Sequence, residues 1–185
     1  MDRIRVFISS TQVDLQAERD RVEAVVAELG YECLRAETLA APGVSSEEAC
    51  REMARKCDIY VGIFGARYGF WVPKLACSAT EMEYREARLS APGKVFVYVK
   101  NAIGIEDEQS RFLGEVQDFS DGYFRHERFQ SATQLGEQFK QDLVAWTSRR
   151  VREALAKEVE VKALRAKVAH LASVMEIYGI PEDLR

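Results

Sequence analysis

Apolar residues concentrate most strongly in residues 58–69 (DIYVGIFGARYG). The first half of this stretch has almost no polar interruption, which is typical of a strand covered on both faces in a parallel sheet. Gly62 and Gly65 allow other backbone to approach closely, and residues 65–69 form a polar loop bounded by glycines. Ligands of open α/β sheets bind at the carboxyl ends of strands, so this pattern places a site at the loop.

Further apolar runs alternate with helical patterns on both sides of this strand. Such alternation predicts parallel strands joined by right-handed crossovers, and hence a sheet order that begins 2-1-3. We expect an α/β fold with a three-layer parallel sheet of about five strands in the order 2-1-3-4-5. The expected strands are 3–9, 31–36, 58–64, 94–100 and a short edge strand at 123–129; the expected helices are 13–29, 45–56, 78–89 and 106–119.

Small polar residues mark the expected helix starts. Thr11 is the predicted N-cap of the first helix, with Asp14 at the capping-box position, and Ser45 or Ser46 is predicted to cap the second. The turn at residues 9–12 would present backbone N–H groups and hydroxyls at a helix N-terminus, an arrangement that binds anions such as phosphate. Capping alone is the other explanation.

The chain changes character after about residue 130. Residues 133–177 contain no proline, which predicts one long helix or two abutting ones, with its first apolar residues packing on the sheet. This division gives an α/β domain at 1–130 and a helical part at 131–185. A heptad stripe occupies residues 161–178, and both self-association and packing on the chain's own domain explain it. The tail has the composition of a linker, so we expect a longer parent protein. The first apolar set is Leu135, Phe139, Leu143 and Trp146; the stripe is Val161, Leu164, Val168, Leu171, Met175 and Tyr178.

Charge and composition narrow the classes of function. A formal net charge of −4 over 185 residues argues against a nucleic-acid footprint. No apolar run approaches a membrane span and no signal peptide precedes the first strand, so we expect a cytoplasmic protein with no membrane partner. Cysteines without CxxC spacing are expected as buried or half-buried thiols, and two distant histidines predict no metal site. These residues are Cys33, Cys50, Cys57, Cys77, His126 and His170.

Four motifs together carry a family resemblance. They are residues 6–11 (VFISST), 14–15 with 18–19 (DL, ER), 58–65 with 67–69 (DIYVGIFG, RYG) and 78–84 with Ala87 (SATEMEY). Over about residues 3–100 the chain resembles the domain-of-unknown-function family 4062, found at the amino end of large multidomain proteins. That family is distantly similar to Toll/interleukin-1 receptor (TIR-like) domains and nucleoside deoxyribosyltransferases, which share a flavodoxin-like sheet.

The resemblance implies chemistry at an N-glycosidic bond. Both groups of relatives use a glutamate on the helix after the third strand, and residues 83–87 (EYREA) have the spacing of the transferase pattern Glu-x-Gly-x-Ala, with Arg85 in place of glycine. A carboxylate beneath the anomeric carbon would stabilise an oxocarbenium-like state or trap it covalently. Glu83 is therefore the expected catalytic residue, and Glu81 is the alternative. The substrate would be NAD or a related nucleotide, with no cofactor required.

Neighbouring polar and aromatic residues supply candidate substrate contacts. Arg67 could pair bidentately with a diphosphate, and Ser78 or Thr80 could bind the carboxylate or a ribose hydroxyl. Each of these residues has a purely structural alternative. Glutamates in the first turn of a helix are favoured by the helix dipole alone. Arg67 could form an ion pair with Asp14 or Glu18, and the aromatic side chains could pack the loop shut. The expected sugar or phosphate contacts are Ser9, Ser10 and Thr11; the expected stacking residues are Tyr68, Phe70 and Trp71.

Two functions of different classes remain open from the sequence. One is an effector or signalling domain of a larger protein, with a nucleotide pocket that cleaves an N-glycosidic bond. The other is a non-catalytic module that self-associates or recruits a partner through residues 161–178. A third is ligand sensing without turnover.

Overall fold

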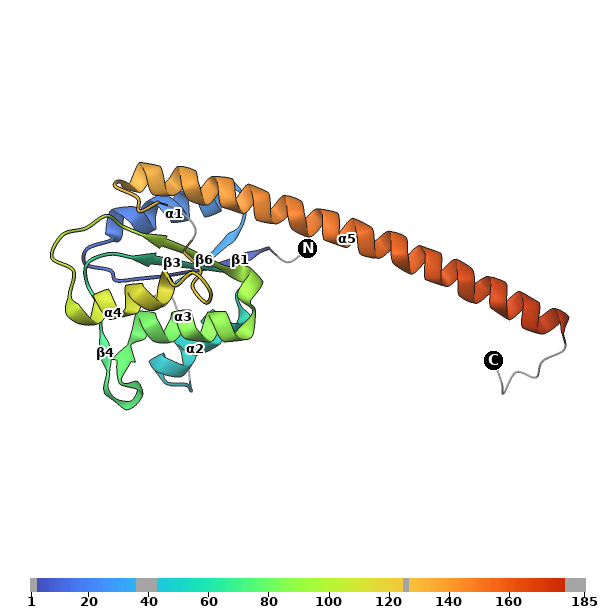
Figure 1. Ribbon diagram of the computed structural model, residues 1–185, viewed down its shortest axis with the longest axis horizontal. Coiled ribbons are helices and arrows are strands. Elements are labelled where there is room, and N and C mark those ends of the chain that lie inside the picture. Colours follow the sequence, from blue (N-terminus) through green and yellow to red (C-terminus); the bar gives the residue numbers. More distant parts are fainter. Residues whose placement is uncertain (1–2, 36–42, 125–126, 179–185) are drawn as a thin grey trace. The chain divides into compact units, whose positions relative to one another are not determined.

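A four-stranded parallel sheet forms the centre of the computed structural model, which describes residues 3–35, 43–124 and 127–178 (Figure 1). The strands lie in the order β2-β1-β3-β6, where β6 is the fourth strand of the sheet along the chain. This confirms the predicted order for the first four strands, in a flavodoxin-like arrangement. Their bounds are β1 Arg5–Ser10, β2 Glu32–Leu34, β3 Ile59–Phe64 and β6 Val95–Val99.

The predicted fifth strand is present only as two isolated parallel bridges. Phe124 pairs with Val97, and Phe129 pairs with Lys100 at the end of β6. Phe129 is fully buried, whereas Glu127 beside it is exposed. The segment thus supplies one apolar anchor at each end rather than a continuous ladder.

Helices cover both faces of the sheet. Figure 1 shows α1 (Gln16–Glu28) on one side of the strands and α2 (Ser46–Lys56) and α3 (Ala79–Ser90) on the other. The α2/α3 side also holds α4 (Asp107–Val116), whose Phe112 joins one apolar cluster with Tyr60, Phe64 and Tyr84. Successive residues of a strand point to opposite faces of the sheet. Because helices cover both faces, all six positions of β3 are buried.

Gly62 is required by this aromatic packing. A Cβ atom at position 62 would lie 2.6 Å from Cζ of Phe64 and 3.1 Å from Cε1 of Tyr60. Phe64 packs edge-on against Phe112 at a centroid distance of 4.9 Å and against Tyr84 at 6.1 Å. The glycine in the middle of the central strand therefore makes room for the rings on either side of it.

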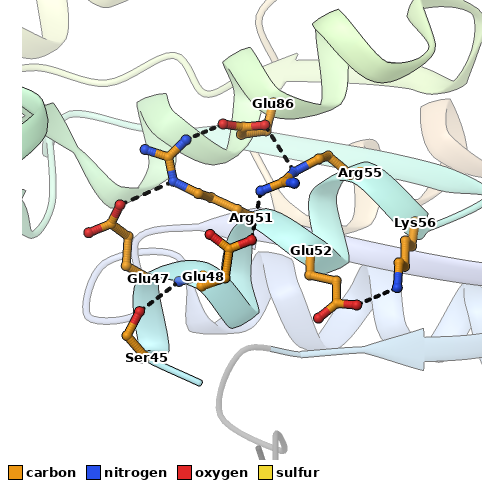
Figure 2. A network of polar contacts seen from close by, with 8 residues as sticks. All are labelled: Ser45, Glu47, Glu48, Arg51, Glu52, Arg55, Lys56 and Glu86. Carbon is orange, nitrogen blue, oxygen red and sulfur yellow. Dashed lines mark hydrogen bonds and ion pairs between the residues drawn. The ribbon is translucent and has the colours of Figure 1, made fainter. Parts of the chain in front are cut away.

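An ionic network joins α2 to α3 (Figure 2). Ser45 caps α2, as predicted, by accepting the backbone N–H of Glu48 at 3.2 Å. Glu86 of α3 contacts Arg51 and lies 3.2 Å from Nε of Arg55. These contacts join α2 to α3, the helix that carries both candidate glutamates.

The start of α1 differs from the prediction. Its N-cap is Leu15, with no side-chain hydrogen bond, because Thr11 Oγ1 instead donates to Asp14 Oδ1 at 2.5 Å. The helix consequently begins at Gln16, and the proposed capping box does not form. The four cysteines are thiols, as expected: Cys57 and Cys77 buried, and the other two half-buried.

Two very short strands follow β3, where the sequence showed only an aromatic segment. β4 (Trp71–Val72) and β5 (Cys77–Ser78) pair in antiparallel fashion, separated by a 3-10 turn, η2 (Pro73–Leu75). The backbone N–H of Ala79 donates to the carbonyl of Phe70 at 2.8 Å. This hairpin leads directly into α3. A second short turn, η3 (Pro92–Lys94), precedes β6.

α5 (Ala132–Ile177) is a single helix of 46 residues. Of the two predicted alternatives, the structure therefore has one long helix and not two abutting ones. Its first turns are part of the first compact unit, residues 1–140, where Phe139 packs edge-on against Tyr98 at 6.2 Å. Residues 141–185 form the second unit, so the chain divides inside this helix. Within the described residues, no helix is apolar and long enough to span a bilayer.

Candidate functional site

Two loops meet at the carboxyl edge of the sheet. Gly69, in the loop after β3, has a φ of +90°, and a Cβ there would lie 2.9 Å from the methyl carbon of Thr11. Gly65 approaches the same turn, since its Cβ would lie 3.1 Å from Asp14 Oδ2. The turn after β1 and the loop after β3 are therefore in direct contact, at the ends of two paired strands.

A cavity of about 490 Å³ opens between these loops and the start of α3. Its volume lies within the range of small-molecule sites. Six of the sequence-predicted site residues line it: Ser10, Thr11, Arg67, Phe70, Thr80 and Glu83. The remaining lining residues are Phe7, Ile8, Gln12, Val13, Arg19, Cys50, Gly69 and Ala79.

Glu83 lies at the inner wall of this cavity, and its side chain is only 7% exposed. Ser9 Oγ donates a hydrogen bond of 2.5 Å to Glu83 Oε2, joining the end of β1 to α3 across 74 residues of sequence. The pKa of the nearby Tyr60 is raised well above its ordinary value, first by burial and then by the negative charge of Glu83. Ser9 thus orients the carboxylate from behind, and Tyr60 stays a neutral phenol beside it.

Glu81 occupies a different environment, although it is two residues away on the same helix. It is fully buried and absent from the cavity lining. Arg85 Nη2 lies 2.5 Å from its Oε1, and Arg111 Nη2 donates to its Oε2 at 2.7 Å. Tyr68 Oη also donates to Oε2, at 2.5 Å. We name Glu81 with Tyr68, Arg85 and Arg111 the Glu81 cluster.

Two of the predicted contacts, Tyr68 and Ser78, lie at the Glu81 cluster, Tyr68 as a member and Ser78 bonded to it. Ser78 caps α3 through a 3.1 Å hydrogen bond from the backbone N–H of Glu81, and its own N–H donates to Tyr68 Oη. Burial and the hydrogen bond to Glu81 raise the pKa of Tyr68. The structure therefore places Glu81, Tyr68 and Ser78 together but apart from the cavity.

Two arginines give the cavity its positive charge. Arg67 is exposed, and among the described residues it makes no ion pair with Asp14 or Glu18, the neighbours considered for it; Glu18 instead contacts Lys100 Nζ at 2.7 Å. Arg19 is 5% exposed and donates to Ser10 Oγ at 2.9 Å. Guanidinium groups bind phosphate oxygens well, so this wall favours an anionic ligand.

Sequence reasoning missed Arg19 as a site residue, although a signal for it was present. The N-cap Leu15 continues the buried stripe of Val22 and Val26 in α1, and Arg19 falls on that stripe by its spacing. A charged residue at a buried position of an amphipathic helix requires a polar partner. Here the partner is the Ser10 side chain at the cavity wall.

The aromatic residues differ in their exposure. Phe70 is 76% exposed and lines the cavity, so it is available to stack on a base. Trp71 packs against Tyr68 at a centroid distance of 6.2 Å and does not line the cavity. Within the described part of the chain, no group of three or more His, Cys, Asp and Glu is arranged to hold a metal ion.

Comparisons with known proteins locate the chain in a family. The family model described as "Domain of unknown function (DUF4062)" matches residues 5–144. A TPR repeat-containing protein of Dictyostelium discoideum is 27% identical over 138 residues, which cover 65% of this chain. The matched part is only 8% of that protein's length.

Two solved structures show distant likeness. The CMP N-glycosidase BcmB of Clostridium botulinum has 16% sequence identity and a TM-score of 0.43, over 76% of this chain and 98% of that chain. Diflavin flavoprotein A3 of Nostoc sp. has 16% identity and a TM-score of 0.46, over 82% of this chain and 97% of that chain. Neither likeness bears on what this chain binds.

Proposed function

Since the chain belongs to the domain-of-unknown-function family DUF4062, whose description names no activity, we propose a function from the site itself. The cavity binds a nucleotide of the NAD type, and Glu83 acts in cleaving its N-glycosidic bond. The observation that carries this proposal is a carboxylate oriented by Ser9 at the inner wall of a cavity whose other charged groups are two arginines.

The lining favours a ligand with phosphate at one end and a planar ring at the other. Arg19 and Arg67 would pair with a diphosphate, and the hydroxyls of Ser10 and Thr11 would add hydrogen bonds to it or to a sugar. Phe70, on the exposed side, would stack on a base. Thr80 lies one turn before Glu83 on α3 and would contact a ribose hydroxyl.

The number of carboxylates favours one kind of leaving group. Of the described residues that line the cavity, Glu83 is the single acidic one. Hydrolysis of a glycosidic bond ordinarily uses a second carboxyl group that protonates the leaving atom. A pyridinium ring needs no such proton, because nicotinamide leaves as a neutral molecule with the bonding electrons. Glu83 stabilises the resulting positive charge or forms a transient ester; water then attacks the anomeric carbon, displaces the carboxylate where an ester has formed, and loses its proton to solvent.

The activity test compares matched glutamate substitutions on α3. The 185-residue chain at high concentration is incubated with NAD, and released nicotinamide is measured by chromatography. Glu83→Gln is expected to abolish release. Glu86→Gln, the same change one turn away and outside the cavity, is expected to retain it. Equal turnover by wild type and Glu83→Gln would remove Glu83 from the mechanism.

Binding is tested separately from chemistry. Arg67→Ala is expected to weaken NAD binding by up to about fivefold, because an exposed guanidinium–phosphate pair contributes at most about 1 kcal/mol. Cys50 also lines the cavity, so bound NAD should slow its alkylation and leave Cys33 unaffected. If NAD neither shifts the melting temperature nor protects Cys50, the nucleotide proposal is wrong. Protection without turnover would leave ligand sensing.

We further propose that this domain acts as an effector or signalling part of a larger cytoplasmic protein. The Dictyostelium relative supports this proposal, because the matched region is a small part of a much longer protein with TPR repeats. Such an arrangement would let other domains control access to the cavity or bring copies of it together. Measuring nicotinamide release from the isolated domain and from the domain fused to an inducible dimeriser would test that control.

A further inference from the structure

The second half of α5 carries an apolar stripe that the described residues leave exposed. Val161, Leu164, Val168 and Leu171 are 44%, 53%, 65% and 58% exposed, and Tyr178 at the end of the stripe is 78% exposed. They recur at alternating spacings of three and four residues, which places them on one side of the helix. Contiguous apolar surface of this kind marks a site of association in a protein that is otherwise folded.

The identities along the stripe favour two parallel helices. With Val161 at heptad position a, Leu164 falls at d, Val168 at a and Leu171 at d. β-branched residues at a combined with leucine at d favour a two-stranded parallel coiled coil. The next two positions are Met175 and Tyr178, so every a and d position from 161 to 178 is apolar.

The helix surface already contains a hole of the required form. Val161, Leu164, Arg165, Val168 and Ala169 line a shallow hollow, and the first four have the spacing i, i+3, i+4 and i+7. Knobs-into-holes packing inserts one side chain of the facing helix into four residues of this spacing. In a parallel pair in register, Leu164 of the second copy would occupy the hollow.

Charges beside the stripe select the orientation. Glu160 lies at position g and Arg165 at e, so in a parallel pair each Glu160 faces Arg165 of the other copy, twice by symmetry. An antiparallel pair that keeps all six apolar layers would place Arg165 opposite Ala172 and Lys167 opposite Val174, without opposite charges. Shifting an antiparallel pair to match the charges would bring Lys157 into the core.

We propose that residues 161–178 form a parallel, in-register, two-stranded coiled coil with a second copy of this chain. The interface is built from the a and d residues and flanked by two Glu160–Arg165 pairs. This contact is independent of the cavity, and it would bring two copies of the α/β domain to the same end of the paired helices.

Sedimentation equilibrium of the full chain tests the interface. Wild type is expected to associate reversibly to a dimer, and Leu164→Glu to raise the dissociation constant at least about tenfold. Val159→Glu is the matched control: it adds the same charge to the same helix at an apolar position that is 68% exposed but off the stripe. This control is expected to dimerise like wild type.

Charge reversal tests the orientation. Glu160→Arg and Arg165→Glu should each weaken the dimer, because each places like charges opposite one another at two positions. Mixed in equal amounts, the two variants should form a heterodimer more stable than either homodimer, since both opposite-charge pairs are then restored. An antiparallel pair gives no such gain.

Three results would overturn the proposal. The first is wild type that stays monomeric up to roughly 0.5 mM, a concentration at which even a weak two-helix contact populates a dimer. The second is association unchanged by Leu164→Glu or abolished equally by Val159→Glu. The third, a dimer whose charge variants show no preference for the heterodimer, would refute the parallel arrangement.

Discussion

Glu81 is expected to stabilise the fold, and Glu81→Ala measures how much. Its carboxylate is fully buried and contacts Tyr68, Arg85 and Arg111. The substitution removes the acceptor of the Tyr68 hydroxyl and the counter-charge of both arginines. Since the carboxylate does not line the cavity, the cost should appear as stability rather than as direct loss of a ligand contact.

The magnitude follows from the exposure of the partners. A hydrogen bond to a charged group contributes about 1.5–3 kcal/mol, and that is the contribution of Tyr68. The side chains of Arg85 and Arg111 are 44% and 54% exposed, so water solvates them once the carboxylate is gone. Each ion pair therefore adds at most about 1 kcal/mol. Relief of the buried charge offsets part of the sum, and the net loss is about 2–4 kcal/mol.

Urea unfolding followed by circular dichroism measures this loss. With a slope typical of this chain length, the midpoint should fall by about 1–2 M. Glu108→Ala, at an exposed carboxylate in the first turn of α4, is the control and should cost less than about 1 kcal/mol. A Glu81→Ala protein with an unchanged midpoint and no NAD turnover would refute the structural role and make Glu81 part of the site.

Two further predictions concern the loop contact and the aromatic core. Gly69→Ala should lower the free energy of unfolding by about 1–3 kcal/mol and weaken NAD binding, because the residue has a positive φ and its new Cβ would push against Thr11. Gly93→Ala is the control, since a Cβ there meets no atom within 4 Å, and it should change neither stability nor binding. Equal effects of the two substitutions would contradict the role given to Gly69. Burial raises the pKa of Tyr84 to about 12. The neutral phenol therefore stabilises the fold fully below pH 10, and about 2–3 kcal/mol of stability is lost as the pH rises toward 12. Tyr84→Phe should lessen this alkaline loss in urea titrations, and an identical pH profile would show that other groups cause the loss.

The strand order could be predicted from sequence because it follows from local patterns. Residues 59–64 are apolar on both faces, and only a central strand of a parallel sheet buries both. Helices at regular intervals then restrict the crossovers to one hand. The β4–β5 hairpin escaped prediction because two residues per strand are too few to show a period. Its existence depends on pairing between Trp71 and Ser78, which local sequence does not encode.

Parts of the site that depend on side-chain competition were beyond the sequence. Thr11 and Asp14 have the spacing of a capping box, yet the two side chains bond to each other and the helix starts later. Arg67 was equally consistent with a bridge to Glu18, but Lys100, from a distant strand end, contacts that carboxylate instead. Such outcomes depend on which partner the fold brings closest.

The two glutamates of α3 illustrate how far the sequence reaches. Residues two apart on an α-helix point in nearly opposite directions, so Glu81 and Glu83 could never have served one site together. The sequence therefore required a choice, and the partners make it: Arg111 of α4 contacts Glu81, whereas Ser9 of β1 holds Glu83 at the cavity. A single carboxylate suits a substrate whose leaving group needs no proton. The choice between Glu81 and Glu83 thus follows from the helical rotation that separates the two side chains.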